Sequence, residues 1–312
     1  MKVSVRVPAT SANLGPGFDC LGLALPIYNT ITLEETVLPG SGIEINIINE
    51  GNEIDNMIID DIPRDENNIA YKAIELLYNS IGQEPSELKI NIQSEIPITR
   101  GLGSSASVIV GALLAANKLH GFPADEMALI SIATEVEGHP DNVTPAIIGG
   151  LVFSSMEEDG SIIYRKLHWP KEWKLTVCVP DFELSTSISR SVIPKEIPLQ
   201  DAVYNLKHSA MLMHAIETAD EELLRHALQD KVHQPYRMKL IPGMSDIIEV
   251  FKHEQGVLGA VLSGAGPTLL VISKDYNTDK IKSTVKEIWN GFGISSEVRT
   301  LEIEEQGATI LE

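Results

Sequence analysis

The segment from Pro97 to Ala106 has the composition of a phosphate site and reads Pro-Ile-Thr-Arg-Gly-Leu-Gly-Ser-Ser-Ala. The apolar run 108–116 follows it and predicts a helix that is buried on all sides. The free N–H groups and positive dipole end of such a helix attract an anion. Gly101 and Gly103 lack the Cβ that would keep backbone N–H groups away from phosphate oxygens. The two serines add hydroxyl groups for a phosphate or a metal ion.

A glycine- and serine-rich turn also has two plainer interpretations. Ser104 could cap the helix while the glycines form a turn. The residues from Gly101 to Ala106 also satisfy the G-x-G-x-x-A pattern of dinucleotide-binding enzymes. That pattern needs a tight turn directly after a strand, whereas residues 94–100 intervene here. A Walker loop is excluded because the chain has no Gly-Lys-Ser or Gly-Lys-Thr.

Two further glycine-rich loops carry candidate ligand residues. In the loop 7–22, Asn13 and Asp19 stand among small and apolar neighbours, which is typical of a loop over a ligand. The segment 262–268 reads Leu-Ser-Gly-Ala-Gly-Pro-Thr and places Gly264 in a turn between two apolar strands. Taken alone, the first loop is equally well explained as a connection between strands, and the second is better explained that way.

Composition limits the partners of this chain of 312 residues. With 24 Lys or Arg against 44 Asp or Glu, the formal net charge is −20. An acidic balance argues against nonspecific binding to nucleic acid and to an anionic membrane surface. No apolar run approaches the ~20 residues that cross a bilayer, and residues 1–7 alternate instead of forming a secretion signal. We expect a cytoplasmic protein without disulfides, because Cys20 and Cys178 fit no paired spacing.

Hydrophobic periodicity predicts an α+β fold. Strands are expected at 3–7, 27–33, 43–47, 88–92, 151–154, 162–164, 175–179, 257–262, 269–272 and 297–301. Helices are expected at 68–78, 104–119, 123–135, 201–219, 221–228, 245–254 and 279–289. Consecutive strands favour antiparallel or mixed sheets backed by helices over a doubly wound sheet. We place the domain boundary so that the domains are 1–170 and 171–312, and we assign the acidic stretch 49–67 to the surface.

Together, the three glycine-rich segments resemble the motifs of the GHMP superfamily, which includes galactokinase, homoserine kinase, mevalonate kinase and phosphomevalonate kinase. Residues 97–106 match its P-x-x-x-G-L-G-S-S-A loop at every fixed position. The resemblance is strongest to the homoserine kinase branch, through segments 8–19, 139–143, 187–190 and 262–268. It implies an N-terminal domain like domain 2 of ribosomal protein S5 and a ferredoxin-like C-terminal domain. It also implies phosphorylation of L-homoserine by ATP in threonine biosynthesis, by a homodimer.

The resemblance further implies a nucleotide and metal site. The loop residues that would bind ATP are Pro97, Arg100, Gly101, Leu102, Gly103, Ser104, Ser105 and Ala106. Ser105 and a helix carboxylate would hold Mg²⁺, and we assign the carboxylate to Glu135, with Glu137 as the alternative. Asn68 would contact the nucleotide base.

Phosphoryl transfer needs alignment and charge neutralisation more than a strong base. Several members of the superfamily have an aspartate seven residues before a Gly-Gly pair, and counting back from Gly149 reaches Asn142 here. An amide cannot take up a proton near neutral pH. Asn142 would therefore orient the substrate hydroxyl, which passes its proton to the γ-phosphate. Asp141 is the alternative as a base, but we favour a surface or capping position for it.

Homoserine has a carboxylate, an ammonium group and a hydroxyl. Guanidinium groups suit a carboxylate, and the resemblance puts Arg190 and Arg237 there. Asp19 would face the ammonium group. The residues expected around this substrate are Asn13, Asp19, His139, Asn142, Arg190, Arg237 and Gly264.

Three competing functions have different signatures. A non-catalytic regulatory member of the fold should lose Ser105, the metal carboxylate or a loop glycine, and none is lost here. A kinase of the same superfamily acting on another small hydroxy acid would keep all of them. A nicotinamide enzyme would rest on Gly101 and Gly103 alone.

Overall fold

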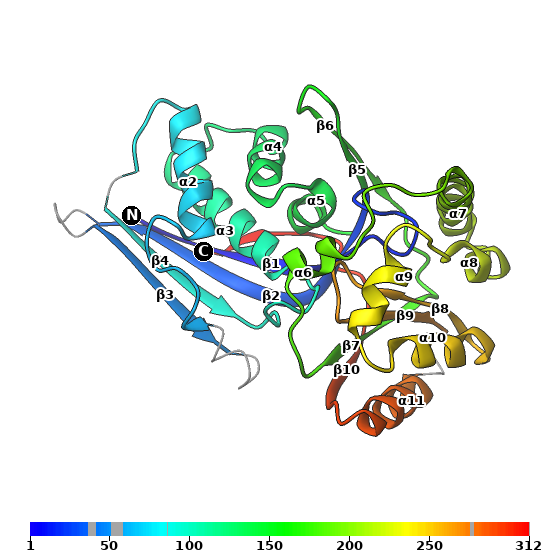
Figure 1. The fold of residues 1–312 in the computed structure, drawn as a ribbon. Helices are drawn as coiled ribbons and strands as arrows, with labels where there is room; N and C mark the ends of the chain where they lie inside the picture. Colours follow the sequence, from blue (N-terminus) through cyan, green and yellow to red (C-terminus); the bar gives the residue numbers. More distant parts are fainter. Residues whose placement is uncertain (37–41, 51–58, 86, 275–277, 312) are drawn as a thin grey trace.

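The computed structural model describes residues 1–36, 42–50, 59–85, 87–274 and 278–311. They form two sheets with helices packed against them (Figure 1). Part of the acidic stretch 49–67 lies outside the described residues. Its described residues 49, 50 and 60–67 are exposed or half-buried, as predicted for a surface segment, but Ile59 is buried.

The larger sheet has seven strands. They are β1 (Lys2–Ala12), β2 (Leu21–Glu35), β3 (Ile43–Asn49), β4 (Leu88–Ser94), β5 (Leu151–Met156), β6 (Ile162–Leu167) and β11 (Thr309–Leu311). The order is β11-β1-β2-β4-β3, and β5 pairs with both β2 and β6. The β3–β4 pair is parallel and the other pairs are antiparallel, so the sheet is mixed, as predicted.

Four helices cover one face of this sheet (Figure 1): α2 (Ile69–Ser80), α3 (Ser104–Leu119), α4 (Glu126–Glu137) and α5 (Pro140–Ile148). The central helix is α3, which is buried along most of its length, as its unbroken apolar sequence predicts. At Gly111 the helix approaches β2 so closely that a Cβ would lie 2.6 Å from Cδ1 of Ile31. This packing fixes the start of α3 rigidly.

The smaller sheet consists of β7 (Lys174–Pro180), β8 (Val257–Leu262), β9 (Leu269–Ser273) and β10 (Ser296–Leu301), in the order β10-β7-β9-β8. All its pairs are antiparallel, and this order is that of a ferredoxin-like domain. Its helices are α6 (Thr186–Ser191), α7 (Leu199–Thr218), α8 (Glu221–Ala227), α9 (Gln234–Arg237), α10 (Met244–His253) and α11 (Thr278–Gly291), with a 3₁₀ turn at Met238–Leu240. The predicted α+β class is confirmed.

The end of the chain lies in the N-terminal sheet, although the predicted second domain is 171–312. Strand β11 pairs with β1 of the larger sheet, and Ala308 N donates to Ala146 O at 2.8 Å. The two halves also share a hydrophobic core, in which Leu14 and Leu23 pack with Leu175 and Leu258. The last residues therefore complete the N-terminal sheet, which a periodicity argument on three residues cannot detect. No helix in the described segments is both long and apolar enough to cross a membrane.

Candidate active site

The three glycine-rich segments meet at the junction of the two sheets and line one cavity of about 410 Å³. Backbone hydrogen bonds tie them together: Thr10 N donates to Leu102 O at 3.0 Å, and Gly264 N donates to Ala12 O at 3.0 Å. The Ser263 hydroxyl contacts Ser11 Oγ at 2.8 Å and Gly101 O at 2.7 Å. Segments that are distant in the sequence thus form one wall, as the shared motif pattern predicts.

The start of α3 faces this cavity. Its N-cap is Gly103, in the left-handed conformation and without a side-chain cap, so Ser104 does not cap the helix. A Cβ on Gly103 would lie 1.9 Å from Thr10 Oγ1, and a Cβ on Gly101 would lie 2.3 Å from Ser263 O. Only glycine fits both positions, and the uncapped N–H groups at the start of α3 suit an anion.

Most of the predicted loop residues line the cavity: Pro97, Arg100, Gly101, Leu102, Gly103, Ser104 and Ser105. Ala106 does not, and the prediction that it contacts the nucleotide is corrected. Its side chain is fully buried in the core between the larger sheet and its helices. Its place in the motif reflects the close packing of α3.

The carboxylate beside Ser105 is Glu137 and not Glu135. Ser105 Oγ lies 2.8 Å and 3.0 Å from the two carboxylate oxygens of Glu137, and Glu137 lines the cavity. Glu135 is exposed and does not line it. On α4, two residues correspond to about 200° of rotation, so the two acids point to different sides. Burial raises the pKa of Glu137, partly opposed by nearby His139 and Ser105.

Helix α5 brings three polar residues to the cavity, and periodicity alone does not predict it because prolines interrupt its sequence. Pro140 occupies its first turn and Asp141 follows, a combination typical of a helix start. Asp141 is 1% exposed, so the expectation of a surface residue is wrong. It is the second residue of α5, whose N-cap is His139. Its carboxylate bonds His139 Nδ1 and lies 3.3 Å from Asn142 Nδ2. Thr10 Oγ1 donates to Asn142 Oδ1 at 2.8 Å, which fixes the amide orientation.

His139 has a raised pKa. Burial by itself would lower the pKa, but the hydrogen bond and charge of Asp141, together with Glu137 and Asp19, outweigh it. Ligand atoms of Asp19, His139 and Asp141 lie within 4.8 Å of one another. These residues form the acidic side of the cavity.

Two arginines also line the cavity. Arg190 on α6 pairs with Asp19 at 2.8 Å, and Arg237 on α9 is buried and donates to Gly264 O at 3.0 Å. Asn13 also donates to Gly264 O, at 3.0 Å, and accepts from the Asp19 N–H at 3.0 Å. All the residues expected around the substrate line this cavity.

The far end of the cavity is apolar and was not predicted. Its wall consists of Ile47, Ile62, Pro63, Ile69, Ile92 and Val108. Asn68 lies here too, 2% exposed, but it caps α2 by accepting from Ala70 N and donating to Pro63 O. Its contact with a base stays a prediction. These apolar residues give no sequence signal because core residues look the same.

Comparisons with known proteins show the family of this chain. The model of the GHMP kinase N-terminal domain matches residues 68–150, and that of the GHMP kinase C-terminal domain matches residues 209–291. A homoserine kinase from Caldicellulosiruptor saccharolyticus is 44% identical over 311 residues, covering 99% of this chain and 96% of its own. One from Microchaete diplosiphon is 42% identical, with 99% and 97% covered.

Solved structures show the same fold. A homoserine kinase from Cytophaga hutchinsonii superposes with a TM-score of 0.88 at 28% identity, covering 99% of this chain and 97% of its own. A galactokinase from Lactococcus lactis has a TM-score of 0.69 at 14% identity, with 99% and 95% covered, which extends the likeness in fold across the superfamily. The full-length sequence identity and the shared fold show that the chain belongs to the homoserine kinase family of GHMP kinases.

Proposed function

We propose that this chain transfers the γ-phosphoryl group of ATP to the terminal hydroxyl of L-homoserine, giving O-phospho-L-homoserine for threonine biosynthesis. The observation that carries the proposal is the pairing of Asp19 with Arg190 in the cavity that also holds the start of α3. An anionic and a cationic side chain together match the ammonium and carboxylate groups of an amino acid.

The nucleotide occupies the other part of the cavity in this proposal. Its base lies against the apolar wall of Ile47, Ile69 and Val108, and its phosphates lie over the start of α3. Apolar walls with a few convergent polar groups are typical of small-molecule sites. This assignment explains why Asn67 and Asn68, at the start of α2, line the same cavity.

Ser105 and Glu137 would hold Mg²⁺. A hydroxyl and a carboxylate are hard oxygen ligands of the kind that Mg²⁺ prefers alongside phosphate oxygens. When bound, the ion supplies positive charge that neutralises the phosphate oxygens.

Asn142 orients the substrate hydroxyl. Because Thr10 fixes its Oδ1, the amide has one orientation, with Nδ2 toward Asp141. The hydroxyl oxygen forms a bond to the γ-phosphorus, the bond from that phosphorus to the β-γ bridging oxygen breaks, and ADP leaves. The hydroxyl proton passes to an oxygen of the transferred phosphoryl group, so no base is consumed.

The experiment is an ATP-consumption assay with purified protein and four acceptors: L-homoserine, mevalonate, galactose and shikimate. L-Homoserine should give the highest kcat/KM. If ATP is consumed mainly with a different acceptor, the substrate is another hydroxy compound. Nucleotide binding without turnover would support a regulatory role. We also propose that the enzyme is a cytoplasmic homodimer. Sedimentation of the purified protein tests the oligomeric state.

A further inference from the structure

The guanidinium group of Arg237 is buried at the cavity, where the charges of Asp19, Asp141 and Asp230 act on it without a direct ion pair among the described residues. Arg237 is 2% exposed, and among the described residues no Asp or Glu forms an ion pair with it. Nη1 donates to Gly264 O at 3.0 Å, and Nε donates to Ser189 O at 3.3 Å. Burial, and next the charge of Arg190, lower its pKa to about 10, so it stays charged at neutral pH. A buried cation of this kind needs other groups to fix its direction.

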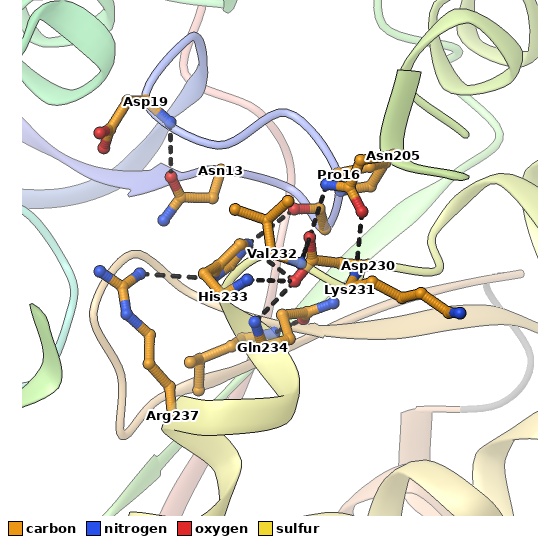
Figure 2. A network of polar contacts seen from close by, with 12 residues as sticks. Asn13, Pro16, Asp19, Asn205, Asp230, Lys231, Val232, His233, Gln234 and Arg237 are labelled. Carbon is orange, nitrogen blue, oxygen red and sulfur yellow. Dashed lines mark hydrogen bonds and ion pairs between the residues drawn. The ribbon is translucent and has the colours of Figure 1, made fainter. Parts of the chain in front are cut away.

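His233 supplies the third contact. Its Nδ1 lies 3.3 Å from Arg237 Nη1 (Figure 2). Its Nε2 lies 2.8 Å from Gly15 O. A guanidinium group only donates, so Nδ1 must accept. The ring proton is therefore on Nε2, which donates to Gly15. The hydrogen-bond partners assign this tautomer.

The surroundings hold the imidazole ring in place. The carboxylate of Asp230 accepts from the backbone N–H groups of His233 at 2.9 Å and Gln234 at 2.6 Å (Figure 2). The ring of Phe18 stacks on the His233 ring with centroids 4.9 Å apart. His233 has no exposed surface, and burial lowers its pKa. The neutral ring is thus held by stacking on Phe18 and by hydrogen bonds at both nitrogens.

We propose that His233, as the neutral tautomer with its proton on Nε2, is a positioning residue that directs the Arg237 guanidinium toward the substrate carboxylate. Because His233 also donates to Gly15 O, it links Arg237 to the loop that carries Asn13 and Asp19. The residues for the substrate carboxylate and for its ammonium group are thus held in place by the same side chain. The inference rests on the proposed function, because it assigns the carboxylate of an amino acid to Arg237. His233 itself does not contact the reacting atoms.

Substitutions at His233 separate positioning from a loss of structure. His233→Leu removes both ring contacts and should raise KM for L-homoserine by roughly tenfold or more, because a hydrogen bond to a charged group is lost. KM for ATP and kcat should change little. His233→Asn keeps an acceptor at the position of Nδ1 and should recover most of the loss. His214→Leu, at an exposed histidine of α7, is the control and should behave as wild type.

A double-mutant cycle tests the route through Arg237. In an Arg237→Ala background, His233→Leu should not raise KM for L-homoserine further, because the group it positions is gone. Fully additive effects would overturn the proposal. So would equal increases of both KM values, or a His233→Asn enzyme as impaired as His233→Leu.

The tautomer can be tested without any substrate. In ¹⁵N NMR of the histidine-labelled wild-type protein, the resonances lost in His233→Asn should report an unprotonated Nδ1 and a protonated Nε2 at neutral pH. A proton on Nδ1 would overturn the proposal whatever the acceptor. If this tautomer is present but L-homoserine is not phosphorylated, the proposed function fails separately, and the KM comparison is made with the acceptor found in the screen.

Discussion

Arg190 Nη2 lies 2.8 Å from Asp19 Oδ1, and Arg190 Nη1 lies 3.2 Å from Asp19 Oδ2, so the two side chains form a two-point ion pair across the cavity. Their side chains remain 41% and 35% exposed. A zwitterionic amino acid carries the same two charges. When such an amino acid binds, its ammonium group can pair with Asp19 and its carboxylate with Arg190. Neither residue is then left unpaired.

This exchange predicts selectivity for the amine. The compound 4-hydroxybutyrate, which is homoserine without its amine, would pair with Arg190 and leave Asp19 without a cation. Because Asp19 is partly exposed, water recovers some of that loss, and we expect kcat/KM to fall by about tenfold or more. Asp19→Asn should reduce kcat/KM for L-homoserine and shrink the ratio between the two compounds. Equal use of both compounds by the wild type would show that Asp19 does not bind the ammonium.

Ser105 and Glu137 should both be needed for turnover. Ser105→Ala and Glu137→Gln should each lower kcat by roughly a hundredfold, because the removal of one charge-stabilising group typically costs that much. Glu135→Gln is the matched control, two residues away on the same helix and exposed, and should retain wild-type kcat. Loss of activity in Glu135→Gln with normal turnover in Glu137→Gln would reverse the assignment. Unchanged melting curves would confirm that the variants fold.

Gly103 should not tolerate a side chain. Gly103→Ala combines left-handed backbone strain of about 1–2 kcal/mol with a Cβ that would lie 1.9 Å from Thr10 Oγ1. We expect ATP-dependent turnover to be abolished, because the start of α3 must move. Gly160→Ala has similar positive φ but open space around the Cβ, so it carries the strain alone. Turnover should survive in that control; equal damage in both variants would show that the contact with Thr10 is unimportant.

Asn142 and Asp141 should separate orientation of the hydroxyl from proton removal. Asn142→Ala should lose most of kcat, because Nδ2 and Oδ1 no longer align the hydroxyl, whereas Asp141→Asn should keep substantial activity. The measurement is kcat for each variant at saturating ATP. The reverse order would restore Asp141 as a general base.

His139 should add a pH dependence to stability. Its pKa is raised above the ordinary 6.5 in the folded protein. A raised pKa means that the folded state binds a proton more tightly than the unfolded state. The stabilisation is therefore complete below about 6.5 and is lost as the pH rises through the folded value. The difference in unfolding free energy between wild type and His139→Gln should shrink with rising pH, as measured by urea unfolding. A difference that is constant from pH 6 to 9 would contradict this.

The sequence by itself determined the local features. The unbroken apolar run predicts α3, and the glycines before it predict its phosphate-binding start, because these properties depend on neighbours within one helical turn. The succession of strands and helices along the chain also favours an antiparallel or mixed sheet backed by helices, whereas the ferredoxin-like domain was implied by the family resemblance. The family resemblance predicted Asn13, Asp19, Arg190 and Gly264 as members of one site, and all of them line the cavity.

Only the tertiary structure decided which side chains meet. Glu135 and Glu137 are equivalent in sequence, and the packing of α4 against α3 selects Glu137. Asp141 looks like a surface residue, yet α5 buries it. Strand β11 is too short to predict, and its pairing with β1 depends on contacts with the opposite end of the chain. His233 belongs to no recognised motif. Arg237 is only four residues further along the chain, but the carbonyl oxygen of Gly15, which fixes the other ring nitrogen, is brought there by long-range folding.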